Sequence, residues 1–198
     1  MLFRSLSDFF SLADASEADW EHTVSWVDCL NGEGRGIFMR ANPVDAGKDE
    51  PTAPPRLSVP LVPPVSLINR LSLRPFNAMY FYLKKATRTS VQHYEAFFHP
   101  LDNVQDWNRI YGPRGFFQYQ CVLPQGVGQE AVHAMLRRIA RSGMGSFLAV
   151  LKTFGKREAV GMLSFAMPGV TLALDFPHQG ERTLQLMAAL DEIGRAHV

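Results

Sequence analysis

Two glutamines separated by a single residue carry the clearest binding chemistry in this sequence. Gln118 and Gln120 lie in residues 115–123, a segment rich in aromatic and branched side chains that is typical of a strand. Because side chains alternate along a strand, both amides point to one face, where Phe116 and Val122 flank them. Buried amides need hydrogen-bonding partners, so either protein groups or a polar ligand must meet this face.

Two later strands present further polar groups by the same alternation. They are expected at residues 146–154 and 170–176. The residues that share one face are Val150, Lys152 and Phe154 in the first strand, and Thr171, Ala173 and Asp175 in the second. Taken alone, Lys152 is more typical of a surface lysine whose stem covers apolar surface, so its residue type does not define a site.

Hydrophobic periodicity predicts the elements that must hold these faces. Helices are expected at residues 2–13, 66–86 (in two pieces broken near Pro75), 102–111 (from an Asp102 N-cap to Gly112), 129–141 and 179–193. Strands are expected at residues 22–30, 35–40, 87–94, 115–123, 146–154 and 170–176. Strands interleaved with few helices, some joined as hairpins, predict an α+β fold in which a mainly antiparallel sheet is covered on one side by helices.

Two other patterns are interpreted as structural rather than as binding sites. Gly32, Gly34 and Gly36 separate two strands instead of a strand and a helix, so a hairpin turn is favoured over a phosphate cradle. The arginines of helix 129–141 lie on its outer and C-terminal side, where a solvated face is favoured over a phosphate site. Residues 42–65 are rich in proline and charge and are expected to form a long surface loop.

Composition and charge exclude several classes of protein. The chain has 198 residues, 46% hydrophobic and 20% charged, which fits one globular domain with a sizeable core. A net charge of +1 gives no reason to expect nucleic acid as a partner. We expect no membrane-spanning segment and a cytoplasmic location, and peripheral membrane association stays open. Cys29 and Cys121 do not have the spacing of metal ligands. We therefore expect both to be buried free thiols and expect no bound metal ion.

An ordered set of motifs runs through nearly the whole chain. It consists of TVSWVDCL and GRGIFMR, then FFHPLD, WNRIYGPRGF and QYQ, and finally FLAVLKTFG, LSF-x-x-PG and LALDFP. In order and spacing this set resembles the substrate domain of FAD-linked oxidases of the vanillyl-alcohol-oxidase type, nearest to decaprenylphosphoryl-β-D-ribose oxidase-like proteins. The resemblance implies a substrate-binding (cap) domain over residues 1–191, with one sheet face closing over the flavin of FAD.

The resemblance also implies which residues form the pocket. The substrate-binding positions of the family match Trp26, Phe98, Gln118, Gln120, Val150, Lys152, Phe154, Thr171 and Ala173. Gln120 and Lys152 would also contact the cofactor, FAD. Amides suit sugar hydroxyls, and a lysine suits a phosphate or an anionic reduced flavin as a point charge. The implied function is oxidation of a sugar-type alcohol, for example a prenyl-phosphate-linked pentose, with hydride transfer to flavin.

The sequence departs from this family at several points. Phe98, Thr171 and Ala173 stand where mycobacterial members have Tyr, Asn and Cys, so a simpler sugar, an alditol or a sugar lactone stays open as substrate. The FAD-binding domain is missing and no catalytic residue can be assigned, so the chain alone is expected to be inactive. Residues 192–198, EIGRAHV, match the translation of a common sequencing adapter and are interpreted as a non-native tail.

Two rival hypotheses stay open. In one, the chain is a non-catalytic fragment or split subunit that binds substrate or a separate chain carrying the FAD-binding domain. In the other, the fold serves structural interaction alone. The second rival predicts that the face with Gln118, Gln120 and Lys152 is buried against the chain's own helices.

Overall fold

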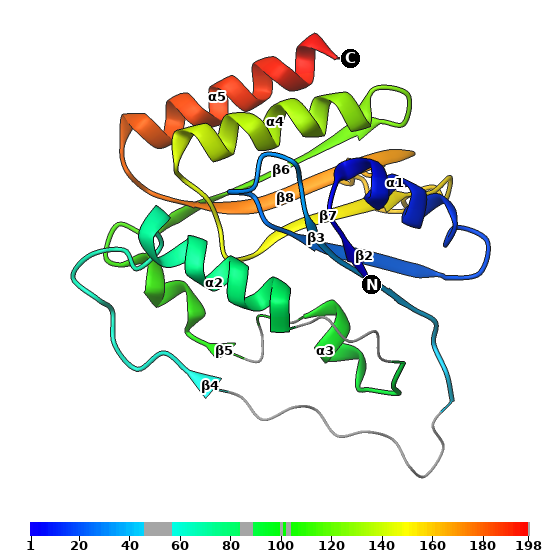
Figure 1. Cartoon of the computed structure of the whole chain (residues 1–198), viewed down its shortest axis with the longest axis horizontal. Helices are drawn as coiled ribbons and strands as arrows, with labels where there is room; N and C mark the ends of the chain where they lie inside the picture. The colour runs from blue at the N-terminus through cyan, green and yellow to red at the C-terminus, as the bar shows by residue number, and fades with distance from the viewer. Residues whose placement is uncertain (46–56, 84–88, 100, 102–103, 198) are drawn as a thin grey trace.

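A six-stranded antiparallel sheet forms the centre of the molecule, with strand order β1-β3-β2-β7-β8-β6 (Figure 1). The computed structural model describes residues 1–45, 57–83, 89–99, 101 and 104–197. The strands are β1 (Leu2–Phe3), β2 (His22–Val27), β3 (Gly36–Ala41), β6 (Phe116–Pro124), β7 (Ala149–Phe154) and β8 (Gly169–Pro177). Two short strands, β4 (Leu57–Ser58) and β5 (Val104–Gln105), pair parallel in a separate ladder. The expected α+β fold with a mainly antiparallel sheet is confirmed.

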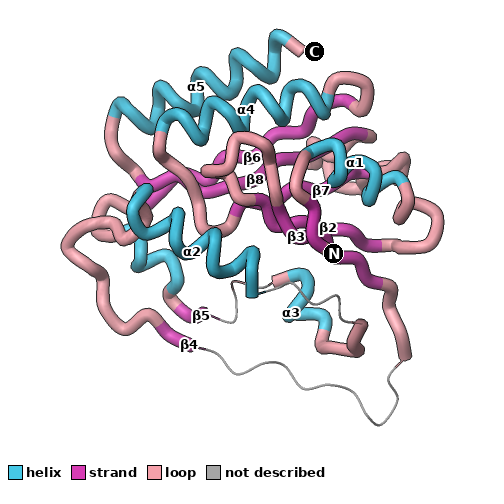
Figure 2. Tube along the Cα trace, viewed as in Figure 1, coloured by secondary structure: helices cyan, strands magenta, loops and turns pink. Residues whose placement is uncertain are grey.

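Three helices cover one face of this sheet (Figure 2). They are α1 (Leu6–Asp14), α4 (Gly128–Ser142) and α5 (Glu181–Ala196). The inner side of α4 is fully buried at Met135, Leu136 and Ile139, whereas its arginines are exposed, as a solvated outer face requires. Each buried Leu or Ile contributes about 1.5–3 kcal/mol relative to an exposed one, so this layer supplies most of the folding energy.

The opposite face is covered toward both ends. Near β2 and β3, helix α2 (Arg70–Leu83) packs on it, and Phe81 joins Trp26 and Ile37 in a small buried cluster. Near β6, the 3-10 helix η2 (Trp107–Tyr111) packs on it, and Tyr111 joins Ile68 and Leu73 in a second buried cluster against Phe116. Helix α3 (Tyr94–Phe98) lies beside β2, with the Phe98 ring 4.9 Å from the ring of His22. The remaining part of this face, over β7, β8 and β6, carries the polar residues discussed below.

Strand pairing is uneven along the sheet. Nine residue pairs join β6 to β8, six join β7 to β8, and six join β2 to β3. Only two registered pairs, Ser25 with Leu151 and Trp26 with Val150, join β2 to β7. The sheet therefore consists of two well-paired halves that meet at a short seam between β2 and β7.

The segment before β6 differs from the helix expected at residues 102–111. A 3-10 helix, η2 (Trp107–Tyr111), begins only after Asp106, and Val104–Gln105 forms β5 instead. Asp106 adopts a left-handed backbone conformation with φ of 56°, which an α-helix cannot contain. The proposed N-cap, Asp102, lies outside the described residues. The end of the helix at Gly112 is confirmed, where φ is 76°.

Two further predictions were wrong. Helix α2 is continuous through Pro75, which removes one backbone hydrogen bond near the start of the helix, at the exposed Leu71. No strand forms at residues 89–93, and residues 87 and 88 lie outside the described part. Instead His93 acts as the N-cap of α3, its Nδ1 accepting from the Glu95 amide at 3.4 Å.

The turn between β2 and β3 confirms the hairpin that its glycines predicted. The two strands pair antiparallel from His22 opposite Ala41 to Val27 opposite Gly36. A side chain at Gly36 would lie 2.2 Å from the Trp26 carbonyl oxygen, so only glycine fits this close approach.

Candidate functional site

Most of the predicted site residues lie in adjacent rows on one face of the sheet. One row crosses four strands in register: Gln120 is opposite Ala173, Ala173 is opposite Val150, and Val150 is opposite Trp26. The neighbouring rows place Gln118 opposite Asp175, and Lys152 opposite Thr171. Opposed side chains on a sheet stand about 4.5–5.5 Å apart, so these groups form one continuous surface. We call it the open face: Gln118, Gln120, Val150, Lys152, Phe154, Thr171, Ala173 and Asp175.

The two glutamines are exposed, while Val150, Lys152, Phe154 and Ala173 are partly buried. The purely structural hypothesis required this face to be buried against the chain's own helices. Exposure of both amides does not fit that hypothesis. At Gln118, Gln120 and Lys152 the open face is instead a polar surface accessible to a ligand or to further protein.

Gln120 is anchored through its amide nitrogen. Its Nε2 donates to the hydroxyl oxygen of Thr171 at 3.3 Å, and Thr171 is only 1% exposed. This contact leaves the Gln120 carbonyl oxygen free to accept from a ligand hydroxyl. Thr171 thus contributes to the site by orienting an amide rather than by reaching the surface.

Lys152 is a cation without a counter-charge. Burial lowers the pKa of its ammonium group, and no ion pair holds it within the described ranges of the chain. A partly desolvated ammonium of this kind attracts an anionic group strongly, because little water competes for it. The open face therefore combines hydrogen-bond acceptors with one positive point charge.

Asp175 joins the open face although the resemblance did not indicate it as a site residue. It is 3% exposed, and its Oδ1 has no hydrogen-bond partner in the described structure. Burial raises the pKa of its carboxyl group to about 6, and the polar amide of Gln118, which lies across from it on β6, opposes part of this rise. The signal in the sequence was the period of two in Thr171, Ala173 and Asp175, which places all three on one face.

The tyrosine beneath Asp175 is also missing from the predicted set. Tyr111 of η2 is 1% exposed, and its hydroxyl has no hydrogen-bond partner in the part of the chain that is described. Burial raises the pKa of Tyr111, and the carboxylate of Asp175 raises it further. Its ring packs on Phe116, with centroids 4.5 Å apart.

Trp26 and Phe98 lie away from the exposed part of the face. Trp26 is 3% exposed, its indole nitrogen donates to the Phe147 carbonyl at 2.9 Å, and Tyr80 covers it edge-on. Phe98 is half exposed on α3, against His22. In this arrangement Trp26 supports the row from beneath α2, and Phe98 borders the face at the start of β2.

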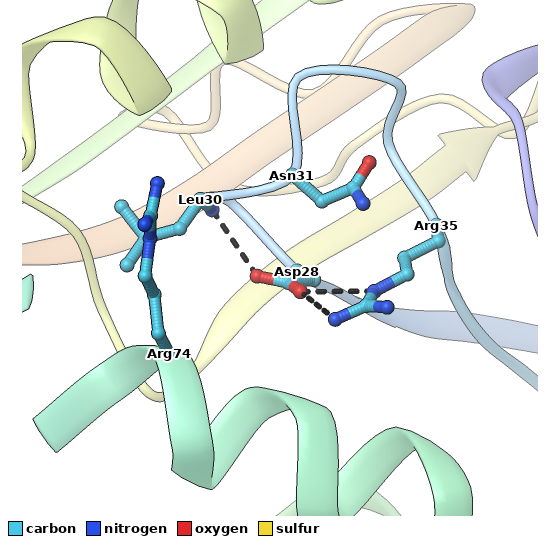
Figure 3. Close-up of a pocket in the computed structure, with 5 residues that line it drawn as sticks. All are labelled: Asp28, Leu30, Asn31, Arg35 and Arg74. Carbon is cyan, nitrogen blue, oxygen red and sulfur yellow. Dashed lines mark hydrogen bonds and ion pairs between the residues drawn. The ribbon is translucent and has the colours of Figure 1, made fainter. Parts of the chain in front are cut away.

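A cavity of about 270 Å³ lies at the β2–β3 turn, beside α2 (Figure 3). Its centre is the buried Asp28, which accepts from Arg35 Nη2 at 2.8 Å and Nε at 3.0 Å. Asn77 of α2 donates to the other carboxylate oxygen at 2.7 Å. Arg74 reaches the cavity from α2 toward Leu30 (Figure 3). Because every Asp28 oxygen is satisfied by the protein, we assign this pair to attaching α2 to the sheet.

The described part of the chain holds neither a metal-binding cluster nor a helix that could span a membrane. No group of three or more His, Cys, Asp or Glu residues there could hold a metal ion. None of the helices described is long and apolar enough to cross a membrane. Both cysteines are free; Cys29 is buried, which raises its thiol pKa to about 12, whereas Cys121 is only partly buried.

Comparison with known proteins supports an oxidase family, the class that the ordered motifs indicated. A scan against protein-family models finds no match. The chain is 34% identical, over 177 residues, to decaprenylphosphoryl-β-D-ribose oxidase of Mycolicibacterium smegmatis. The match covers 83% of this chain and 38% of that protein, so the chain spans well under half the length of its relative.

Proposed function

We propose that this chain is the substrate-binding portion of an FAD-dependent oxidoreductase that oxidises a sugar-type alcohol. The observation that carries the proposal is the open face itself. Amide carbonyls and a cation without a counter-charge occupy adjacent rows of a rigid sheet, and similarity to an oxidase extends over 83% of the chain. Such a surface suits a ligand with hydroxyl groups and a negative charge.

The residues present fit an FAD cofactor on this side of the sheet. Lys152 and Gln120 are the side chains that would contact it, because among the described residues the ammonium has no counter-charge and the amide oxygen has no donor. A bound flavin would be the acceptor of the hydride that leaves the alcohol carbon. Lys152 would balance a negative charge, on the cofactor or on a substrate phosphate, and the glutamines would orient the sugar.

The substrate class follows from the polar groups and from the relative. A prenyl-phosphate-linked pentose carries both hydroxyls and a phosphate, which match the amides and Lys152. An alditol or a sugar lactone would use the amides alone. The difference between these substrates therefore depends on whether Lys152 meets the substrate or the cofactor.

An exposed apolar segment favours completion of the enzyme by further protein. Between β7 and β8, the side chains of Val160, Met162 and Leu163 are almost fully exposed. Apolar side chains exposed together mark contact surfaces. The FAD-binding domain could meet them in the same polypeptide or as a separate chain, and the second arrangement is the split-subunit alternative. Residues 1–191 would form the cap domain in either case.

A chimera tests the function directly. The 177-residue segment of the Mycolicibacterium oxidase would be replaced by the matching part of this chain. We expect a folded protein that retains flavin absorbance and oxidises at least one of three substrates: decaprenylphosphoryl ribose, an alditol and an aldonolactone. A folded chimera without flavin would refute the cofactor assignment, and a flavin-bound chimera inactive on all three would refute the substrate class.

The split-subunit alternative has its own measurement. Flavin absorbance of the purified chain, before and after addition of FAD, shows whether the open face holds the cofactor by itself. Binding by the wild type that falls at least tenfold in Lys152→Met would favour that alternative, since a charge-assisted contact contributes about 1.5–3 kcal/mol. Lys156→Met is the matched control, because this lysine lies two residues beyond β7 and is exposed.

A further inference from the structure

The buried carboxylate of Asp175 lies directly opposite Gln118, in the row of the open face that borders η2. Asp175 is 3% exposed, whereas Gln118 is exposed. One carboxylate oxygen, Oδ1, has no hydrogen-bond partner in the described structure. An acid held in this position needs a donor, since unpaired buried polar atoms are costly.

Few groups can act as that donor. Tyr111 of η2 lies near the carboxylate, but its hydroxyl makes no hydrogen bond within the described residues. Lys152 lies opposite Thr171, four residues along β8 from Asp175, so its ammonium belongs to another row. The register places the Gln118 amide directly opposite the carboxylate, although no hydrogen bond joins the two side chains in this conformation of the described residues. Gln118 is therefore the partner that the local geometry provides.

The chemistry of the pair determines which end of the amide faces outward. An ionised carboxylate only accepts hydrogen bonds, whereas an amide has a donor end and an acceptor end. The NH₂ group of Gln118 must then face Asp175, and its carbonyl oxygen must face solvent. Gln120 has the same orientation through Thr171, so both glutamines present acceptors.

We propose that Asp175 is a positioning residue, which holds the Gln118 amide with its carbonyl oxygen outward and so makes the open face select ligand hydroxyl groups. The ligand class rests on the proposed function, but the orientation of Gln118 does not. Protonated Asp175 would itself become a donor and would no longer require the NH₂ end of the amide. The presentation of Gln118 is therefore coupled to the charge on Asp175.

The test follows the side-chain NH₂ signals of Gln118 and Gln120 by ¹H–¹⁵N NMR of the intact chain between pH 4.5 and 8. We expect the Gln118 signals to titrate with a midpoint near pH 6, and the Gln120 signals to stay unchanged. Gln118→Met and Gln120→Met assign the two pairs of signals. The measurement needs neither flavin nor substrate, so its outcome is independent of the proposed function.

Two variants identify the titrating group. Asp175→Asn should abolish the Gln118 titration, and Tyr111→Phe should leave it in place. The proposal is overturned if Gln118 does not titrate in the wild type, or if it still titrates in Asp175→Asn. Loss of the titration in Tyr111→Phe would also overturn it, because the carboxylate would then depend on the tyrosine. If Asp175→Asn fails to fold, the carboxyl ¹³C signal of Asp175 in the wild type replaces it: the same midpoint as Gln118 supports the proposal, and a different midpoint overturns it.

Discussion

The two faces of β8 differ in how completely their side chains are satisfied. Leu172 and Leu174 point into the helical layer and are 0% and 2% exposed, surrounded by apolar neighbours. Between and beyond them, Ala173 and Asp175 point to the open face, where a buried carboxylate oxygen has no partner in the described structure. The helix-covered face stabilises the fold, and the open face retains polar groups at some cost in stability. That division is typical of a binding surface on a rigid scaffold.

The largest expected effect is on the free energy of unfolding, and it should differ between the helix-covered face and the open face. Leu172→Ala should lower the free energy of unfolding by about 2–5 kcal/mol, because it removes a fully buried side chain and leaves a cavity. Gln120→Ala on the open face should lower it by only about 0.5–1.5 kcal/mol, through loss of the hydrogen bond to Thr171. Urea denaturation of both variants measures the difference. Equal losses would mean that the open face is part of the core.

An intermediate effect concerns pH. The pKa of Asp175 is raised from 3.8 to about 6, so in this range the folded chain binds more protons than the unfolded chain. The contribution of Asp175 to stability is therefore present below pH 4 and is lost as pH rises through about 6. The loss should amount to roughly 1–3 kcal/mol.

Asp175→Asn isolates this contribution from other titrating groups. Denaturation at pH 5 and pH 8 should show that the wild type loses more stability across this interval than the variant does. A wild type and variant with the same pH dependence would contradict a raised pKa for this carboxyl group.

The smallest effect concerns Lys152. Lys152→Met should raise the free energy of unfolding at pH 7 by roughly 0.5–1 kcal/mol, because methionine removes a partly buried charge that has no counter-charge. Lys156→Met should change it by less. Thermal unfolding of the two variants measures this difference. A loss of stability in Lys152→Met alone would indicate that the lysine has a structural role.

Strand faces were predictable because the period of two is a strong local signal. The alternation placed Gln118 with Gln120 on one face of their strand and Lys152 with Val150 and Phe154 on one face of theirs. The resemblance assigned both groups to one pocket, and the register places them on one face of the sheet. Helix α4 was equally clear from its apolar stripe, and the structure places that stripe in the core. Such features depend only on residues near one another in the chain.

Burial on the open face was not predictable in the same way. Trp26 is covered because Tyr80 and Phe81 of α2 pack at one end of the sheet, and residues so distant in sequence leave no mark on the pattern around Trp26. Asp175 is enclosed beside Tyr111, which precedes it by 64 residues in a 3-10 helix that was expected to be an α-helix. Local propensity gave the faces, and tertiary packing decided which parts of them stay accessible.

The short seam between β2 and β7 has a consequence for how the molecule folds. Strands β6, β7 and β8, together with α4 and α5, come from residues 116–196 and pair extensively with one another, so their contacts close comparatively short loops. The β1–β3–β2 half must instead find β7 across more than a hundred residues, and it is joined there by two registered strand pairs, by the shared core and by the hydrogen bond from Trp26 to Phe147. We expect the C-terminal half to form first and to open last, so amide hydrogen exchange should be slowest in β8 and faster in β2 and β3.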